Sequence, residues 1–297
     1  MQRFGGSPGV VGAYWLDDDD LLSADYFDQV APYLRPENAG MLVSLATGLT
    51  ALQEADGRFS TFRDSYVPMI AIGLISICRR EEDGSVVAPV WSPHSRADRS
   101  NPVILDSRRP SYLWVRHQDQ DTTMGYGETA ALGRVLDHLA TRPIAEGADV
   151  ERLFPAVAQR VRPMERVTLT SEARALTQPH TIHFDIPVEG LFNLGVEVTC
   201  GPGAVANNVL VSLDVVDDHG APPAAGDMIA GATHSPNPAI GFYRYVSTQE
   251  GSRTSTHDLV VPSGFTCRGI TLRTWRRPET AVTLDRVWIL RAAPAAP

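Results

Sequence analysis

The sequence contains no lysine: all 26 basic residues are arginine, and 35 acidic residues bring the formal net charge to −9. A protein that binds nucleic acid regardless of sequence needs a basic surface to neutralise phosphates. No basic cluster interrupts this acidic chain, so we expect no nucleic-acid partner. The exclusive use of arginine, together with the alanine, glycine and proline content, indicates a GC-rich bacterial genome.

Cysteine and long apolar runs are also scarce. Cys78, Cys200 and Cys267 form no CxxC pair, and no histidine accompanies them at zinc-finger spacing, so no structural zinc site is expected. A disulfide between Cys200 and Cys267 would require the fold to bring the two together. No signal-peptide pattern is present, and no run approaches the roughly 20 apolar residues that span a bilayer. We therefore expect a cytoplasmic protein without a transmembrane segment.

The most distinctive stretch is a run of four consecutive acids, Asp17 to Asp20. Residues 10–16 before it predict a short buried strand, and Ser23 after it is a candidate N-cap for a helix that reaches residue 34. Adjacent carboxylates repel one another, so a fold tolerates them where they are solvated or hold a cation. A solvated turn is the plainer interpretation. Acids between a strand and a helix, however, lie where open α/β sheets bind ligands.

Two stretches carry a family resemblance. Residues 16–23, Leu-Asp-Asp-Asp-Asp-Leu-Leu-Ser, resemble the DXD segment of GT-A-type glycosyltransferases, in which acids hold a divalent cation against a nucleotide-sugar diphosphate. Residues 93–106, Pro-His-Ser-Arg-Ala-Asp-Arg-Ser-Asn-Pro-Val-Ile-Leu-Asp, and the following 112–122 strengthen this likeness. Their order is similar to that of a bacterial rhamnosyltransferase family over roughly residues 13–130. The resemblance implies a partial GT-A-like α/β fold for the N-terminal half.

The resemblance also implies roles for individual residues. Asp17 and Asp19 would hold Mg²⁺ or Mn²⁺, Asp17 thereby contacting the donor, because hard cations prefer oxygen ligands. His117, at the end of an apolar strand, is the candidate third ligand. Asp119 or Asp121 would be the general base that removes the acceptor hydroxyl proton, and the sequence does not decide between them. For each of these residues taken alone, a polar surface loop is the alternative.

Only residues 1–16 precede the acids, whereas a GT-A domain places two or three βα units there, on the order of 60 to 90 residues. The Gly-rich leader offers no phosphate-binding motif in their place. The chain thus resembles a glycosyltransferase without its nucleotide-binding half. Either the start lies upstream of Met1 or the fragment is catalytically incomplete.

The middle of the chain predicts strands and two helices. Residues 40–52 and 58–63 flank the turn signal Asp56-Gly57 and predict a hairpin. Residues 68–80 predict a buried strand. Its Gly73 either allows an acceptor to approach the backbone closely or allows close packing within the fold. Helical spacing over residues 126–140 predicts the helix that closes the first domain, and residues 149–161 predict another, interrupted by Pro155.

Beyond Arg162-Pro163 the pattern changes to short, often alternating segments separated by Gly, Pro, Asn and Asp. Without a helix signal between them, they predict an all-β jelly-roll-type sandwich. The expected domains are therefore 1–163 and 164–297. The segments are 167–170, 181–186, 191–198, 209–216, 242–246, 255–261, 269–275 and 282–290.

The second half offers His234, Trp275 and Trp288 as a sugar platform, although such tryptophans are more often core or edge residues. The sequence does not decide whether this half binds a glycan surface or a sister subunit of an oligomer. The main functional hypothesis is transfer of a deoxyhexose, rhamnose-like, from a nucleotide-sugar donor to a glycan or other hydroxyl acceptor. The alternative is a non-catalytic carbohydrate-binding or assembly protein derived from a truncated glycosyltransferase. A metal-dependent hydrolase is a third hypothesis, for which no nucleophile motif is present.

Overall fold

The computed structural model describes residues 9–120, 127–145, 147–224, 227–277 and 279–293. The fold is mostly β, with 45% strand and 14% helix. It comprises two compact units, the first formed by Met1–Arg116 and Arg142–Val161, the second by His117–Thr141 and Arg162–Pro297. The chain therefore passes between the units after residues 116, 141 and 161, and the last passage falls beside the expected boundary at 163. No helix among the described residues is long and apolar enough to cross a membrane.

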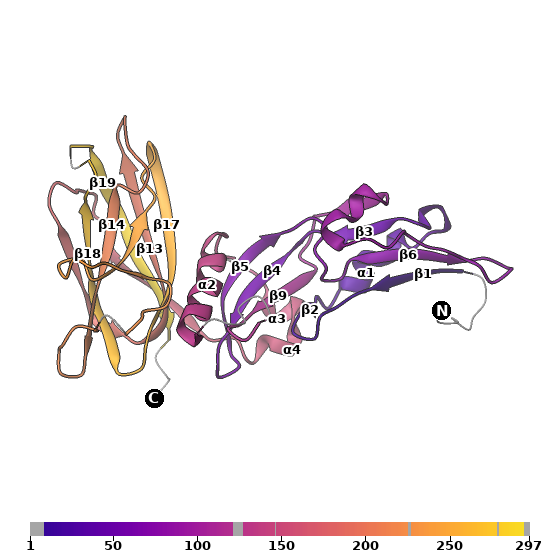
Figure 1. The fold of residues 1–297 in the computed structure, drawn as a ribbon, viewed down its shortest axis with the longest axis horizontal. Coiled ribbons are helices and arrows are strands. Elements are labelled where there is room, and N and C mark those ends of the chain that lie inside the picture. Colours follow the sequence, from indigo (N-terminus) through magenta and orange to yellow (C-terminus); the bar gives the residue numbers. More distant parts are fainter. Residues whose placement is uncertain (1–8, 121–126, 146, 225–226, 278, 294–297) are drawn as a thin grey trace. The chain divides into compact units, whose positions relative to one another are not determined.

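Two mixed sheets form the first unit (Figure 1). Strands β3 and β8 pair in parallel in one sheet, and β4 and β9 pair in parallel in the other. The connections β1 to β2, β3 to β4 and β8 to β9 each lead from the first sheet to the second. The first sheet contains β1 (Gly9–Tyr14), β6 (Ile75–Arg80), β3 (Leu42–Leu45) and β8 (Val103–Asp106), with β7 (Val86–Val87) beside β6. The second contains β2 (Leu21–Leu22), β9 (Tyr112–Arg116), β4 (Thr47–Gln53) and β5 (Phe59–Tyr66).

The predicted hairpin is present, since β4 and β5 pair antiparallel around the Asp56-Gly57 turn. The strand expected before the acids differs from the prediction. Among the described residues, β1 pairs with β6 alone, and its side chains are largely exposed, with Val11 49% and Tyr14 43% accessible. An edge strand lacks a neighbour on one side, which leaves its apolar residues open to solvent.

Helices in the first unit are short, so the structure does not confirm an α/β half. The helix expected over residues 23–34 is reduced to α1 (Tyr26–Val30) followed by a 3₁₀ turn, η1 (Ala31–Tyr33). Pro32 has no backbone N–H to continue the α-helical ladder. Asp25, not Ser23, occupies the N-cap position, and the Ser23 hydroxyl donates to Asp25 instead. The remaining helices are η2 (Pro36–Asn38), η3 (His94–Arg99), α3 (Val150–Leu153) and α4 (Pro155–Ala158).

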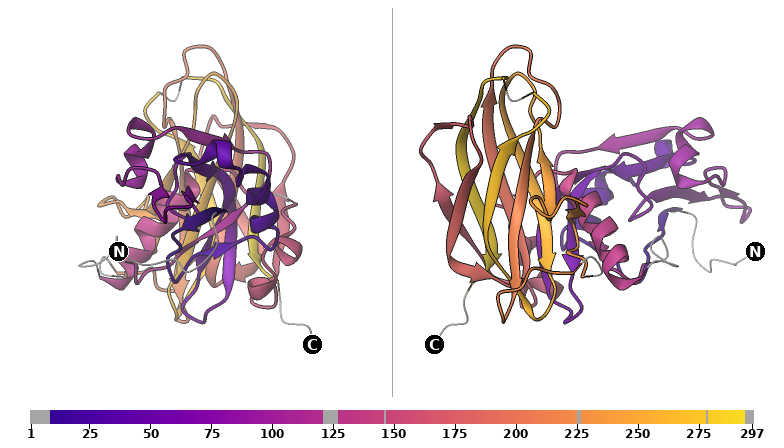
Figure 2. Two further views of the ribbon diagram at one scale, coloured as in Figure 1. Left: turned by 90° about the vertical axis from the view of Figure 1, so that its right-hand side faces the viewer. Right: turned by 60° about the vertical axis from the view of Figure 1, so that its left-hand side comes forward.

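Two antiparallel sheets form the body of the second unit, seen as two layers in Figures 1 and 2. Their strand orders, β10-β19-β13-β17 and β12-β18-β14-β16, are those of a jelly roll and agree with the predicted sandwich. The first sheet contains β10 (Met164–Thr170), β19 (Val282–Ala292), β13 (Gly190–Cys200) and β17 (Gly251–Val261), with β11 (Arg174–Ala175) beside β19. The second contains β12 (His180–Val188), β18 (Phe265–Thr274), β14 (Val209–Asp217), β16 (Phe242–Val246) and β15 (Thr233–His234).

Both sheets of the sandwich contribute to one hydrophobic core. Val196 and Val287 enter it from the first sheet, and Val211 and Ile270 from the second. Burying the inner face of every strand removes much apolar area from water, which is the main stabilising term of such a domain. Cys200 and Cys267 are both buried in this core as free thiols.

Helix α2 (Glu128–Ala140) belongs to the second unit and packs on β17 (Figure 1), whereas the sequence pattern suggested that it closes the first domain. Val135, Leu136 and Leu139 form its buried stripe. Asp137 on this helix forms an ion pair of 2.9 Å with Arg244 of β16. A long-range packing preference of this kind leaves no signature in local periodicity.

Candidate functional site

The acidic residues form the turn that joins β1 to β2. The Asp20 N–H donates to the Asp17 carbonyl oxygen at 3.3 Å, which closes the turn. Asp17 and Asp18 are exposed, Asp19 is half-buried, and Asp20 is only 7% accessible. Four identical residues thus occupy three different environments: exposed, half-buried and buried.

Asp20 anchors this turn to strand β9. Its Oδ1 accepts a hydrogen bond of 3.0 Å from the Val115 backbone N–H. Directly after it, Leu21 and Leu22 pair with Leu113 and Tyr112 of the same strand. The two stretches that carry the family resemblance are therefore adjacent in space.

The carboxyl group of Asp20 has a strongly perturbed affinity for protons. The pKa of Asp20 is raised to about 7: burial is the main cause and the nearby charges of Asp19 and Asp17 add to it, while the hydrogen bond from Val115 and the charge of Arg116 oppose the shift. The sequence analysis selected Asp17 and Asp19 and missed Asp20. Only the pairing of β2 with β9 reveals which of the four acids is buried.

Arginine and tryptophan side chains accompany Asp20 at the end of β9. Arg116 is 9% accessible, and its guanidinium carbon lies 4.8 Å from the ring centroid of Trp114. The guanidinium of Arg142 lies 5.4 Å from the same centroid. Burial, joined by the charge of Arg142, lowers the pKa of Arg116. Planar guanidinium groups of this kind suit phosphate and carboxylate oxygens.

The remaining predicted site residues follow β9. His117 is half-buried and Asp119 is exposed; both belong to the second unit, whereas Asp17 and Asp19 belong to the first. Asp121 lies outside the described residues. Within the described part of the chain, no group of three or more His, Cys, Asp or Glu side chains could hold a metal ion.

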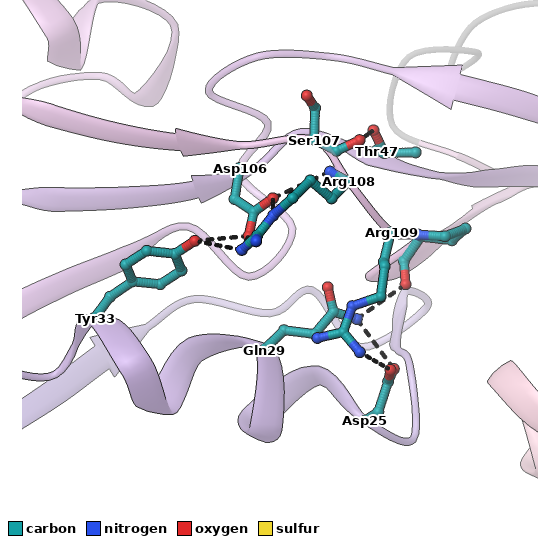
Figure 3. A network of polar contacts seen from close by, with 9 residues as sticks. Asp25, Gln29, Tyr33, Thr47, Asp106, Ser107, Arg108 and Arg109 are labelled. Carbon is teal, nitrogen blue, oxygen red and sulfur yellow. Dashed lines mark hydrogen bonds and ion pairs between the residues drawn. The ribbon is translucent and has the colours of Figure 1, made fainter.

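A polar network positions the segment that leads from β8 into β9 (Figure 3). Arg108 donates to both carboxylate oxygens of Asp106, at 2.9 and 2.7 Å, and the Tyr33 hydroxyl donates to the same carboxylate at 2.7 Å. These hydrogen bonds, chiefly that from Arg108, hold the pKa of Asp106 well below its usual range. Because β9 follows within a few residues, the network fixes the strand to which Asp20 is anchored.

A second part of the same network ties this segment to α1. Gln29 Nε2 donates to the Pro110 carbonyl oxygen at 3.1 Å and to Asp25 Oδ1 at 3.0 Å. Arg109 forms an ion pair of 3.6 Å with Asp25 (Figure 3). The first helix and the segment before β9 are therefore fixed against each other.

Other residues singled out by the resemblance have structural partners. His94 Nδ1 lies 2.9 Å from the Met69 carbonyl oxygen. Gly73 has a φ of +69°, and a Cβ added there would lie 2.8 Å from the Tyr26 ring. The Tyr26 hydroxyl also donates to the Gly73 carbonyl oxygen. These contacts support the packing interpretation of Gly73.

The predicted sugar platform of the second unit is not assembled as expected. Trp288 is 4% accessible, because its ring lies over Gly195 and contacts the guanidinium groups of Arg166 and Arg286. His234 of β15 contacts Phe242 of β16 in a tilted arrangement, with ring centroids 4.7 Å apart. Trp275 is exposed.

No family model matches the chain, and searches of curated proteins and of solved structures find no match either.

Proposed function

We propose that the first unit takes part in metal-dependent glycosyl transfer, passing a deoxyhexose such as rhamnose from a nucleotide sugar to a hydroxyl acceptor. The observation that supports this is the hydrogen bond from Val115 to Asp20, which joins the acidic turn to the strand of the second resembling stretch. Two sequence segments whose joint presence suggested the family are thereby neighbours.

The donor set around the turn fits a hard cation that is only partly coordinated by protein. Mg²⁺ is commonly held by one or two carboxylates and completes its shell with water and substrate phosphates. Asp17 and Asp19, on the solvent side of an anchored turn, match this pattern, whereas the described residues provide no cage made of protein alone. A cation bound there would offset charge on the leaving diphosphate.

The residues of the chain have separate roles in this proposal. Asp20 holds the turn in place, and Asp17 and Asp19 supply the carboxylates for the cation. Arg116 offers a guanidinium group to phosphate oxygens of the donor. Asp119 and Asp121 remain the candidate general bases, and His117 remains the candidate additional ligand.

Calorimetric titration of the full chain with MnCl₂ tests the cation site. We expect Asp17→Ala and Asp19→Ala each to weaken Mn²⁺ binding about tenfold or more, because each removes a charged oxygen ligand. Asp218→Ala is the matched control, since Asp218 is an exposed acid in the second unit. Equal Mn²⁺ affinity in parent and Asp19→Ala would leave the acidic run as a solvated turn.

Donor binding tests the transfer itself. With Mn²⁺ present, dTDP and a dTDP-deoxyhexose should bind the parent and bind Arg116→Gln more weakly. If neither ligand binds, the non-catalytic alternative replaces this proposal. Where turnover is measured with an acceptor, full activity in both Asp119→Asn and Asp121→Asn would place the base elsewhere.

A further inference from the structure

The outer face of the sheet β12-β18-β14-β16 presents aromatic and polar side chains in register. In β16, Phe242 and Val246 are buried, while Tyr243 and Tyr245 alternate with them and face outward. The residues that pair with each tyrosine on the neighbouring strands form a row across the sheet. One row contains Tyr243, Ser212 and Thr271; the next contains Tyr245, Leu210 and Arg273.

Trp275, directly after β18, extends the second row into an aromatic stack. Its ring is stacked on Tyr245, with centroids 5.7 Å apart and planes at 23°, and Tyr243 meets Tyr245 edge-on at 5.2 Å. The guanidinium of Arg276 lies 5.1 Å from the Trp275 ring centroid. Although it is stacked, Trp275 remains 44% accessible. An indole ring this exposed contributes little to a core and is available to a ligand.

Hydrogen bonds to Asn207 and Asn208 fix the segment that carries Trp275. The buried side chain of Asn208 accepts hydrogen bonds from the Arg276 and Arg277 N–H groups, at 3.1 and 2.7 Å, and donates to the Arg277 carbonyl oxygen at 2.9 Å. Trp275 Nε1 donates to the Asn207 carbonyl oxygen at 2.9 Å. The ring orientation is therefore fixed before any ligand arrives, which reduces the entropy lost on binding.

Polar groups on the same face lack partners. Ser212 Oγ and Arg273 Nε are buried and have no hydrogen-bond partner among the described residues. Over the same part of the chain, neither Arg273 nor Arg276 has a carboxylate within ion-pair distance. Unsatisfied buried polar atoms are uncommon in folded proteins and call for an explanation. A ligand carboxylate would give Arg273 and Arg276 the anionic partner that the described residues do not supply.

We propose that this face, defined by Tyr243, Tyr245, Arg273, Trp275 and Arg276, binds an acidic glycan that contains uronic acid units. The C–H face of a pyranose ring stacks on the fixed indole, and a uronate carboxylate pairs with the guanidinium of Arg276 or Arg273. The site differs from the platform suggested by the sequence, since Trp288 and His234 are not part of it. The inference goes beyond glycosyl transfer by the first unit and does not depend on it.

Native affinity electrophoresis of the full chain tests the proposal, with polygalacturonate, alginate, hyaluronate or neutral dextran in the gel. We expect retardation by at least one acidic polysaccharide and little by dextran. The protein carries a net charge of −9, so non-specific attraction to polyanions does not account for retardation. Trp275→Ala should weaken binding about tenfold or more, and Arg276→Gln and Arg273→Gln should weaken it for acidic polysaccharides.

The matched controls are Trp91→Ala, which removes a 79% accessible tryptophan from the first unit, and Arg253→Gln on β17 of the other sheet. Both should bind like the parent, and circular dichroism should show that every variant is folded. The proposal is overturned if none of the three acidic polysaccharides retards the protein, if dextran retards it equally, or if Trp275→Ala binds like the parent. It is also overturned if sedimentation shows a dimer that Trp275→Ala dissociates, because the face would then contact a second copy of the chain.

Discussion

Gly195 of β13 and Trp288 of β19 are register partners, and the indole ring of Trp288 lies directly over the glycine. A Cβ at residue 195 would lie 2.0 Å from Cε2 of that ring. The absence of a side chain at one position is thus what allows the largest side chain to be buried at the other.

Gly195→Ala should therefore destabilise the second unit, by roughly 1–3 kcal/mol or more, because the added methyl group overlaps the indole ring and forces it from its rotamer. Urea denaturation followed by tryptophan fluorescence measures the change. Gly127→Ala is the control, since a Cβ there meets nothing within 4 Å. Equal stabilities would mean that the indole ring moves aside at no cost.

Asp20 anchors the acidic turn, and two substitutions separate the effect of its hydrogen bond from that of its charge. Asp20→Ala should lower the free energy of unfolding of the first unit by about 1–3 kcal/mol, because it removes the buried hydrogen bond from the Val115 N–H to Oδ1 of Asp20. Asp20→Asn retains an acceptor oxygen and avoids a buried charge, so it should cost much less. Hydrogen exchange at the Val115 amide should accelerate in Asp20→Ala alone, with the exposed Asp18→Ala as control.

Acid should weaken the network around Asp106. Its folded-state pKa is depressed by Arg108, so its contribution to stability is full above the unfolded value near 3.8 and is lost as the pH falls below it. The contribution is on the order of 1 kcal/mol, since the exposed Arg108 is screened by solvent. Urea denaturation between about pH 6 and pH 2 should show a steeper acid loss for the parent than for Asp106→Asn. Parallel pH profiles would contradict this assignment.

Helix α2 should stabilise the sandwich from which it is distant in sequence. Leu136 is fully buried, and its Cδ1 lies 3.5 Å from the position that a Cβ on Gly231 would take. Leu136→Ala should cost about 2–5 kcal/mol in the unfolding of the second unit. Thr129→Ala, at an exposed position of the same helix, should leave that transition unchanged. A lowered stability of the first unit alone would contradict the assignment of α2.

The strands of the second half could be predicted from sequence because short segments, many of them alternating, are separated by turn signals. Residues 242–246 were predicted as one such strand, but the sequence could not show that Trp275 stacks on Tyr245. That contact depends on how β14 pairs with both β16 and β18. Local patterns do not encode such register.

The site in the first unit was only partly predictable. The acidic run was recognisable as a candidate site, but its sequence could not show that Asp20 is buried and Asp17 exposed. A single helix was predicted over residues 23–34, but the α-helix ends at Val30, because Pro32 has no backbone N–H for the next α-helical hydrogen bond. The partner of α2 could not be inferred, since residues 251–261 lie more than a hundred positions beyond it.

The passage of the chain between the units after residues 116, 141 and 161 has a consequence for synthesis on the ribosome. Helix α2 emerges before the first unit is complete, yet its strand partner β17 is translated only at residues 251–261. During that interval Val135, Leu136 and Leu139 have no sandwich to cover them, so the nascent chain exposes this apolar stripe and is most prone to aggregate until β17 has been made.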